Sequence, residues 1–285
     1  IFGENPDDES INGPDKARSI LHKPKWQQVV VLCAGVLFNF IFAGILIVIA
    51  FTAGVPASLD SYPEYESRMA DPHIAITYVE PNSPADLTGF KAGDSVVGYS
   101  TVEEIQKAIN ASRDQGIVIN DKNVVAQQGI VEGKYAIGIS MDKVGTLRLP
   151  IHLALYEGTR FTLHMMQQIA IGLYDLVAGM FRGTAELSSV TGPVGIAGLV
   201  SDAAKLGFTY LLMFTALISL NLGVLNLVPF PALDGGRILF ILIEVAIRRP
   251  IKPVFANTVN AIGFALLILL MVVVTYRDIV KIFVK

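Results

Sequence analysis

The stretch that decides the fold runs from Gly207 to Gly236 and reads GFTYLLMFTALISLNLGVLNLVPFPALDGG. Its first 27 residues, up to Leu233, carry no charge, and Asp234 is the first charged residue after them. A helix that crosses a lipid bilayer needs about 20 predominantly apolar residues. This stretch therefore predicts a transmembrane helix at about residues 208–225, followed by a proline-containing turn that ends in a carboxylate.

Two other stretches carry no charged residue, Trp26–Leu59 and Pro253–Tyr276. Only 16% of the 285 residues are charged, against about 25% in an average soluble domain, and the mean hydropathy is +0.54. A buried helix of a soluble protein rarely has so long a stretch without charged residues, whereas a membrane-spanning helix requires such a stretch. We therefore predict two more transmembrane helices, at about residues 27–53 and 259–275.

Basic residues mark the two loops that precede the first and the last span. They are Lys16, Arg18, Lys23 and Lys25 before the first, and Arg248, Arg249 and Lys252 before the last. Residues 56–157 instead carry 14 Asp or Glu against 8 Lys or Arg. Because short basic loops stay in the cytoplasm, we expect both loops there and residues 56–157 outside. No basic, aromatic-rich surface suggests a nucleic-acid partner, and the lone Cys33 cannot form an internal disulfide.

The sequence pattern divides the chain into five regions. They are a cytoplasmic loop at 1–26, a transmembrane helix at 27–55, an extracytoplasmic α/β domain with a strand extension at 59–157, an amphipathic helix with a Gly-rich connector at 158–206, and a membrane core at 207–285. The pattern of apolar residues predicts strands at 74–79, 116–119, 124–126 and 147–155, and helices at 102–109 and 159–180. The last of these helices is amphipathic, as in helices that lie in a membrane interface. Residues 238–247 are apolar but too few to span, which is typical of an interfacial or re-entrant helix.

The turn after the second span holds the residues that suggest chemistry. A carboxylate such as Asp234 at a membrane span costs roughly 3 kcal/mol near the bilayer centre and less near its edge, so it is a functional candidate by default. Pro229 and Pro231 remove two backbone donors, and irregular backbone at membrane depth is tolerated only where it lines a cavity or is buried in protein. These residues predict a polar pocket near the cytoplasmic face. An ordinary turn, with Asp234 capping a helix that starts near Arg237, is equally compatible with them.

The motif Asn226-x-x-Pro229-x-Pro231-x-Leu233-Asp234-Gly235 resembles the N-x-x-P-x-P-x-L-D-G signature of site-2 intramembrane metalloproteases. Residues 13–40 are similar to the region entering the family's second helix, and residues 192–196 to the stretch before its third, although Val36 stands where the family usually has Pro. The resemblance implies a polytopic helical membrane protein with an inserted α/β domain. It also implies that Asp234 is a zinc ligand, supported by the motif residues Pro229, Pro231, Leu233 and Gly235.

The family's other two zinc ligands are the histidines of an H-E-x-x-H helix, whose Glu is the general base. Histidines four residues apart share one face of a helix, which suits a metal. The four histidines here have no such spacing, and each is expected at a surface or at the membrane interface; they are His22, His73, His152 and His164. Because the sequence begins with Ile1 rather than Met, we expect the H-E-x-x-H helix, one further transmembrane helix, upstream. Asn226 is expected either to hydrogen-bond the substrate backbone or to cap the second span.

Residues 79–97 (VEPNSPADLTGFKAGDSVV) resemble the V-x-x-x-S-P-A-x-x-A-G-x-x-x-G-D-x-I-x stretch of bacterial PDZ domains, with Thr88 in place of the usual Ala. Ser83 is expected to cap a short helix with Pro84 at its first position, and Gly93-Asp94 to turn into a strand. The helix at 102–109 would then flank a groove where a peptide adds as a strand. The resemblance implies either peptide binding or a size filter that excludes bulky substrates, and a spacer domain without a ligand is the alternative.

By this resemblance the protein is expected to cut peptide bonds within transmembrane segments of regulatory proteins, such as anti-sigma factors, at the bacterial cytoplasmic membrane. Its expected partners are membrane-protein substrates, the lipid bilayer and a peptide ligand of the PDZ-like domain. A catalytically inactive, membrane-anchored PDZ scaffold is the alternative, and the upstream codons would distinguish the two. A transporter with a helix broken at residues 226–236 is less expected, because the chain has three spans and no inverted repeat.

Overall fold

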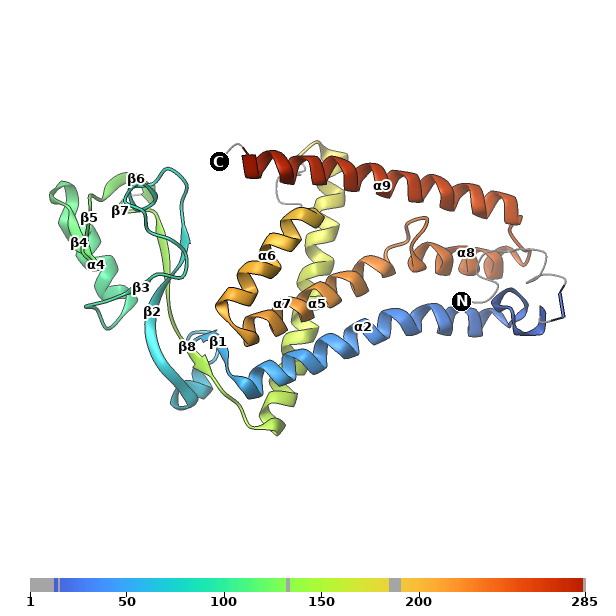
Figure 1. Ribbon diagram of the computed structural model, residues 1–285, viewed down its shortest axis with the longest axis horizontal. Helices are drawn as coiled ribbons and strands as arrows, with labels where there is room; N and C mark the ends of the chain where they lie inside the picture. Colours follow the sequence, from blue (N-terminus) through green and yellow to red (C-terminus); the bar gives the residue numbers. More distant parts are fainter. Residues whose placement is uncertain (1–12, 15, 132–133, 185–190, 284–285) are drawn as a thin grey trace. The chain divides into compact units, whose positions relative to one another are not determined.

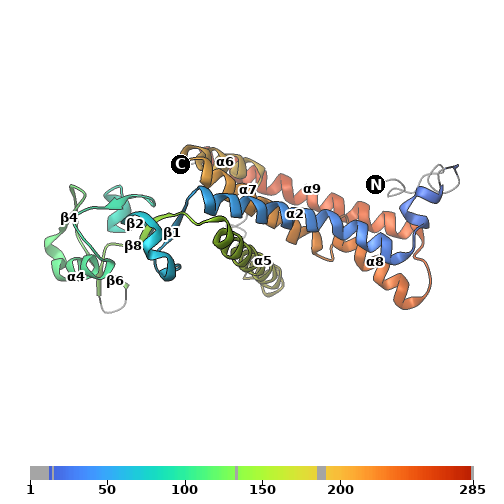
Figure 2. The same cartoon turned by 90° about the horizontal axis from the view of Figure 1, so that it is seen from below.

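The computed structural model describes residues 13–14, 16–131, 134–184 and 191–283. The chain separates into two compact units. The helical unit combines Ile1–Ala50 with Leu153–Lys285, and the α/β unit is Phe51–His152. Figures 1 and 2 show the elements of each unit from two directions.

Long helices dominate the helical unit. They are α2 (Lys25–Ala53), α5 (Ile151–Arg182), α6 (Pro193–Leu206), α7 (Phe208–Leu227), α8 (Asp234–Ile247) and α9 (Pro253–Phe283), preceded by the 3-10 turns η1 (Lys16–Arg18) and η2 (Ile20–His22). Within the described residues, α2, α7 and α9 are long and apolar enough to cross a membrane. Their large apolar side chains are widely exposed, Phe38 and Phe264 among them, as expected of surfaces that face lipid rather than water. The three predicted spans are thus confirmed as long apolar helices.

The segment before α7 differs from the sequence prediction at two places. The strand predicted at 147–155 is wrong beyond Leu147, because β8 ends there and α5 begins at Ile151, directly after Pro150. Ala154, Glu157 and Gly158 are buried at helical spacing, and the local apolar pattern did not distinguish this from a strand. The Gly-rich connector is also wrong in part, because residues 193–206 form the helix α6, with Pro193 in its first turn.

Helix α5 lies across α2 (Figure 1), and small residues allow the close contact. A Cβ atom on Gly158 would lie 2.8 Å from the Val48 side chain, and one on Gly44 would lie 3.8 Å from the Thr162 hydroxyl. Thr162 itself is buried and donates to the Gly158 carbonyl at 2.7 Å. The amphipathic helix predicted at 159–180 is therefore part of a longer helix that packs directly on a span.

Buried or half-buried carboxylates make two of the polar contacts that join helices lying far apart in the sequence. At one, the Lys25 ammonium at the start of α2 pairs with the Glu244 carboxylate of α8, which also accepts from the Ile251 N–H at 2.8 Å. At the other, Asp278 of α9, only 6% exposed, accepts from the Gly195 N–H at 2.8 Å. A carboxylate is stabilised at the N-terminus of a helix such as α6, so this contact attaches α6 to α9.

The α/β unit contains a four-stranded antiparallel sheet in the order β1-β8-β2-β3. Its strands are β1 (Val55–Ser58), β2 (Met69–Val79), β3 (Ser95–Val96) and β8 (Ile139–Leu147). Two hairpins pair β4 (Ile117–Ile119) with β5 (Lys122–Val124) and β6 (Gln127–Val131) with β7 (Lys134–Ala136). The helical elements are η3 (Pro63–Arg68), α3 (Pro84–Leu87), α4 (Val102–Ser112) and η4 (Arg113–Gln115).

Most of the predicted elements of this unit are present. The strands predicted at 74–79 and 116–119 correspond to β2 and β4, and the helix at 102–109 lies within α4. The strand predicted at 124–126 is wrong after Val124, where β5 ends. Val124 pairs with Ile117, the first residue of β4, and Gly116 before it has a φ of +78°. The partner strand thus ends at this position, and the chain leaves the hairpin although residues 124 and 126 remain buried.

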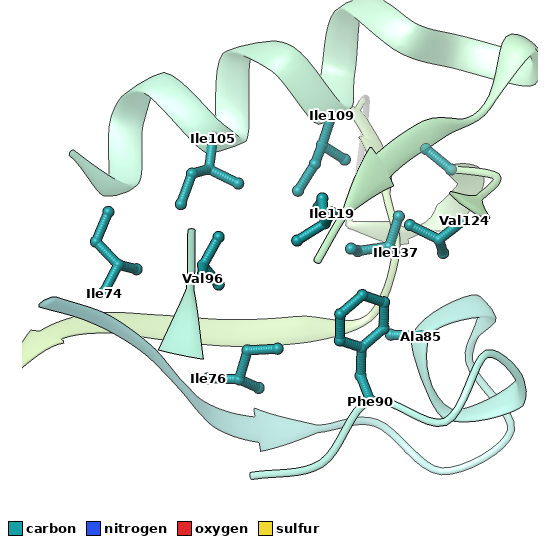
Figure 3. Packing of buried hydrophobic residues seen from close by; sticks show 11 residues of the cluster. Ile74, Ile76, Ala85, Phe90, Val96, Ile105, Ile109, Ile119, Val124 and Ile137 are labelled. Atoms are coloured by element: carbon teal, nitrogen blue, oxygen red, sulfur yellow. The ribbon is translucent and has the colours of Figure 1, made fainter. Parts of the chain in front are cut away.

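An apolar core lies between α4 and the strands (Figure 3). Ile105 and Ile109, one turn apart on α4, point toward Ile76 and Val96 of the sheet and Ile119 of the first hairpin. The other members of the cluster are Ile74, Ala85, Phe90, Val124, Ala126 and Ile137. A polar outer face completes α4, whose Thr101 cap accepts from the Glu104 N–H at 3.2 Å. The unit therefore has a core of its own, as an independently folding domain does.

The two local features expected between residues 79 and 97 are confirmed. The Ser83 hydroxyl caps α3 by accepting from the Asp86 N–H at 3.3 Å, and Pro84 is the first helical residue. The Asp94 carboxylate accepts from the Lys91 N–H at 3.0 Å and closes the turn that leads into β3. Gly93 within this turn has a φ of +96°, a conformation in which a side chain is strained.

Candidate active site

The residues of the proline motif form the connection between α7 and α8. Asn226 lies in the last turn of α7, and Asp234 is the first residue of α8. The six residues between the helices, 228–233, are irregular and close on themselves through two backbone bonds. The Phe230 N–H donates to the Val228 carbonyl at 2.7 Å, and the Leu233 N–H donates to the Phe230 carbonyl at 3.2 Å. We call residues 228–233 the proline turn.

Two buried glycines let the start of α8 lie directly against the end of α7. A Cβ on Gly235 would come within 2.3 Å of the Val228 carbonyl oxygen and 2.5 Å of the Leu227 carbonyl oxygen. One on Gly236 would lie 2.2 Å from the Phe230 carbonyl oxygen. Real Cβ atoms do not approach backbone this closely, so no other residue fits either position without moving the backbone. Gly235, which follows Asp234, is therefore in contact with Leu227, which follows Asn226. This contact brings the side chains of Asp234 and Asn226 to the same end of the helix pair.

The proline turn contains a strained residue. Ala232 has a φ of +74°, in the left-handed region that costs an L-residue about 1–2 kcal/mol. Such a conformation persists only where the surroundings impose it, and strained residues gather at functional sites. Here the strain falls two residues before Asp234.

The structure excludes the alternative in which Asp234 caps a helix that starts near Arg237. The N-cap of α8 is Leu233, and the helix begins at Asp234 rather than near Arg237, so the reading of Asp234 as a cap is wrong. Its side chain is half-buried, and among the residues that the structure describes none forms a hydrogen bond or ion pair with it. Asp234 lies in the first turn of α8, where a negative charge is favourable, and no described side chain occupies its carboxylate oxygens.

Asn226 is also half-buried. The C-cap of α7 is Val228, whose N–H donates to the Leu225 carbonyl at 3.1 Å, so the structure gives the capping position to another residue. In the part of the chain that the structure describes, the Asn226 amide has no recorded hydrogen-bond partner. It therefore offers a donor and an acceptor beside the turn that carries Asp234.

The four histidines do not join this site. All four are exposed, as expected, and one of them, His73, lies on β2 of the α/β unit, where its ring nitrogen contacts the Asp71 carbonyl at 2.8 Å. The described residues contain no group of three His, Cys, Asp or Glu side chains that could hold a metal ion. Asp234 is thus not part of a cluster of three such side chains in these parts of the chain.

An apolar pocket of about 380 Å³ lies elsewhere in the helical unit. Its walls come from α2, α5, α6 and α7, with Ile47, Met165, Leu199 and Phe214 among the lining residues. None of the motif residues lines it. The pocket is therefore separate from the turn that carries the candidate chemistry.

Comparison with known proteins identifies the family. The sequence matches peptidase family M50 over residues 5–270. The chain belongs to this family. Zinc metalloprotease RasP of Oceanobacillus iheyensis is 29% identical over 93% of this chain and 62% of its own length. RasP of Shouchella clausii is 31% identical over 92% of this chain and 61% of its own length.

A Staphylococcus aureus protein named as a candidate zinc metalloprotease is 31% identical over 93% of this chain and 62% of its own length. The chain thus spans about 62% of the length of such relatives. These relatives are named zinc metalloproteases, and zinc is the cofactor of M50 peptidases. Zinc accepts carboxylate oxygen, and a catalytic zinc has three protein ligands. The Asp234 carboxylate has the chemistry of one such ligand, and the described residues contain no cluster of three ligating side chains around it.

Sequence reasoning missed two residues that contact the proline turn. The Asn260 side-chain oxygen on α9 accepts from the Ala232 N–H at 3.2 Å, and Gly263 of α9 is so close to Pro231 that a Cβ there would lie 2.6 Å from its carbonyl oxygen. A signal was present, because an amide within an apolar span is itself a functional candidate. Nothing in the local pattern, however, indicated that its partner lies 28 residues earlier.

Replacing Gly235 by Ala should disrupt the contact between α7 and α8. The added methyl would overlap two backbone carbonyls, and we expect the free energy of unfolding to fall by about 3 kcal/mol. Gly172→Ala is the matched control, because Gly172 lies within α5 with no atom within 4 Å of its Cβ position. Thermal unfolding in detergent measures both variants, and equal stability of the two would contradict the packing of the turn.

Proposed function

We propose that the complete protein is an intramembrane zinc peptidase in which Asp234 is one of the zinc ligands. The observation that supports this most directly is a half-buried carboxylate without a described protein partner, at the start of α8 and beside an apolar helix long enough to span a membrane. Its membership of peptidase family M50 supports the same reaction class. The two other ligands, the histidines of an H-E-x-x-H helix, and its Glu as general base are proposed to lie in a segment outside this chain.

The residues of the turn have distinct roles in this proposal. A zinc ion held by Asp234 and two further ligands would supply Lewis-acid chemistry, lowering the pKa of a water molecule to about 7 and polarising the carbonyl that is attacked. Asp234 contributes a negative oxygen ligand, and the proline turn fixes where that oxygen lies. Pro229, Pro231, Leu233 and Gly235 act through the shape of this turn rather than through contact with the substrate.

The substrate backbone needs a binding partner as well. A helix satisfies its own N–H and C=O groups through bonds between residues i and i−4, so a membrane-spanning substrate has to unwind locally before attack. The groups that this exposes must be bonded by the enzyme, because little water is available at membrane depth. Asn226 is suited to this role, since its amide can donate and accept and has no partner among the described residues.

The substrate class and location follow from the same proposal. We propose that the protein lies in the bacterial cytoplasmic membrane with the α/β unit outside, and that it cleaves membrane-tethered regulatory proteins such as anti-sigma factors. The basic residues that precede α2 and α9 support this orientation. A catalytically inactive membrane-anchored scaffold with the same fold is the alternative, and zinc content together with peptide cleavage separates the two.

Asp234→Asn should remove zinc from the full-length protein. An amide keeps the size of the side chain but loses the charge that zinc requires, and we expect zinc affinity and cleavage of a membrane-tethered reporter to fall at least about 100-fold. Metal analysis of the purified protein and reporter cleavage in membranes are the two measurements. Asp175→Asn, an exposed carboxylate on α5, is the matched control and should change neither. Unchanged zinc in the Asp234 variant would rule out its role as a ligand.

Asn226→Ala should impair cleavage without loss of zinc. Removing one hydrogen bond to the substrate backbone costs about 1.4 kcal/mol, which corresponds to a fall of about 10-fold in kcat/KM. Asn221→Ala on the same helix is the control, because the Asn221 amide bonds the Leu217 carbonyl of its own helix at 2.9 Å. Equal kinetics for both variants would exclude a contact between Asn226 and the substrate.

We propose a second, separable function for the α/β unit, which is peptide binding in the manner of a PDZ domain. The cap of α3, the turn into β3 and the amphipathic α4 support this interpretation. The edge of β8 supports it further. β1 pairs with β8 at residues 144–147, and among the described residues no strand pairs with residues 139–142 on that side.

A peptide could extend the sheet at this open edge. Helix α4 is in contact with β8, so an added strand would lie beside the helix, as in recognition by strand addition. The Lys143 carbonyl faces this side, since it accepts from the Leu59 N–H at 2.9 Å. The backbone N–H and C=O groups of alternate residues in a strand point to the same edge. The Met141 N–H, two residues before Lys143, is therefore expected at this edge too.

Amide hydrogen exchange tests the peptide site. Adding a pool of random decapeptides with free C-terminal carboxylates should slow exchange of the Met141 amide at least about 10-fold. Amides of the β4–β5 hairpin, which pair within the hairpin, serve as the internal control and should not change. If the Met141 amide exchanges at the same rate at saturating peptide concentration, the unit does not bind peptides at this edge and a size filter or spacer becomes its role.

A further inference from the structure

The backbone of the proline turn depends on a residue from another helix. Residues 228–233 contain four N–H groups, because Pro229 and Pro231 have none. Three of them donate to carbonyls of residues 225–230. The fourth, from Ala232, donates to the Asn260 side-chain oxygen of α9. Since backbone groups at membrane depth must be bonded within the protein, Asn260 completes the hydrogen bonding of the turn.

The same face of α9 also contacts the turn sterically. Gly263 lies three residues after Asn260, and residues three apart share one face of a helix. A Cβ on Gly263 would lie 2.5 Å from the Pro231 Cβ and 2.6 Å from the Pro231 carbonyl oxygen. Gly263 therefore allows the turn to lie against the backbone of α9, at the distance where the Asn260 amide reaches the Ala232 N–H.

The hydrogen bond from Ala232 to Asn260 is made by the residue that has the strained backbone conformation. Ala232 holds its positive φ only if the surroundings maintain it, and the bond from Asn260 is formed by the N–H of Ala232 itself. Asp234 follows two residues later and begins α8. A change at Ala232 would therefore shift or rotate the start of α8 and with it the carboxylate.

We infer that Asn260, together with Gly263, is a positioning residue for Asp234, which makes α9 part of the zinc site without supplying a ligand. The inference rests on the proposed role of Asp234 as a ligand. Ligand oxygens must lie within about 0.2 Å of their preferred distance from a metal, so a turn that is free to relax would bind zinc less tightly. Outer-shell partners of metal ligands typically change metal affinity by 10- to 100-fold.

Three variants of the full-length protein isolate this role. Asn260→Leu keeps nearly the same shape but removes the acceptor of the Ala232 N–H. Asn260→Asp keeps an oxygen atom in the same place and is the conservative variant. Asn257→Leu makes the same exchange one turn earlier on α9, at an exposed residue, and controls for the substitution itself.

The first measurement is independent of zinc. In metal-free protein, Asn260→Leu should speed hydrogen exchange of the Ala232 amide at least about 10-fold, whereas Asn260→Asp and Asn257→Leu should leave it near the original rate. The second is zinc affinity, measured by competition with a chelator. It should fall about 10- to 100-fold in Asn260→Leu and recover in Asn260→Asp. For substrate cleavage at saturating zinc, we expect kcat to fall while KM stays unchanged.

Two results would overturn the inference. One is unchanged zinc affinity in Asn260→Leu, and the other is an equal loss of affinity in Asn260→Leu and Asn260→Asp, which would indicate a general packing role. Asp234→Asn, measured alongside, separates this inference from the proposed function. If Asp234→Asn retains zinc, the ligand assignment fails and the inference fails with it. If Asp234→Asn loses zinc while Asn260→Leu retains full affinity, only the positioning role fails.

Discussion

The helical unit depends on one constraint: non-helical backbone beside a membrane span must have its N–H and C=O groups hydrogen-bonded. Water cannot satisfy such groups within the hydrocarbon region, so each must find a partner in the protein. The proline turn meets this requirement by having few donors, because two of its six residues are prolines. It satisfies three of the remaining N–H groups internally and one through Asn260. A turn with ordinary residues at 229 and 231 would have two more donors to bond.

The proline turn also requires close contact between backbone segments. Because Gly235 and Gly236 lack a side chain, backbone carbonyls of residues 227–230 can lie against them, and Pro231 can lie against Gly263 of α9 in the same way. At the other end of α9, Gly192 and Gly195 admit the Asp278 carboxylate, which binds the start of α6. In both places α9 provides a polar acceptor for a backbone N–H while glycine provides the space. This combination joins helices firmly where apolar packing against lipid-like surfaces gives little preference for a neighbour.

Much of this architecture could be predicted from the sequence, and the failures have physical causes. The three long apolar helices could be predicted from the uncharged stretches, and Asp234 could be singled out as a candidate site residue because a carboxylate at a span is costly. The start of α5 and the helix α6 were missed because a short apolar or Gly-rich segment has no decisive period. The contact of Asn260 with Ala232 was missed for a different reason. It joins residues 28 positions apart, and local patterns record the elements but not which of them meet.

Asp234 has no hydrogen-bond or ion-pair partner among the described residues, and this bears on its proposed role. A structural carboxylate near the membrane is normally bonded, as Asp278 is by the Gly195 N–H and Glu244 by Lys25 and the Ile251 N–H. Leaving such a group unpaired costs free energy, and nothing in the described part of the chain offsets this at Asp234 except the N-terminus of α8. The turn around it is nevertheless tightly held by glycine contacts and by Asn260. Such a rigid support is what the proposed ligand needs if it is to meet a metal without rearrangement.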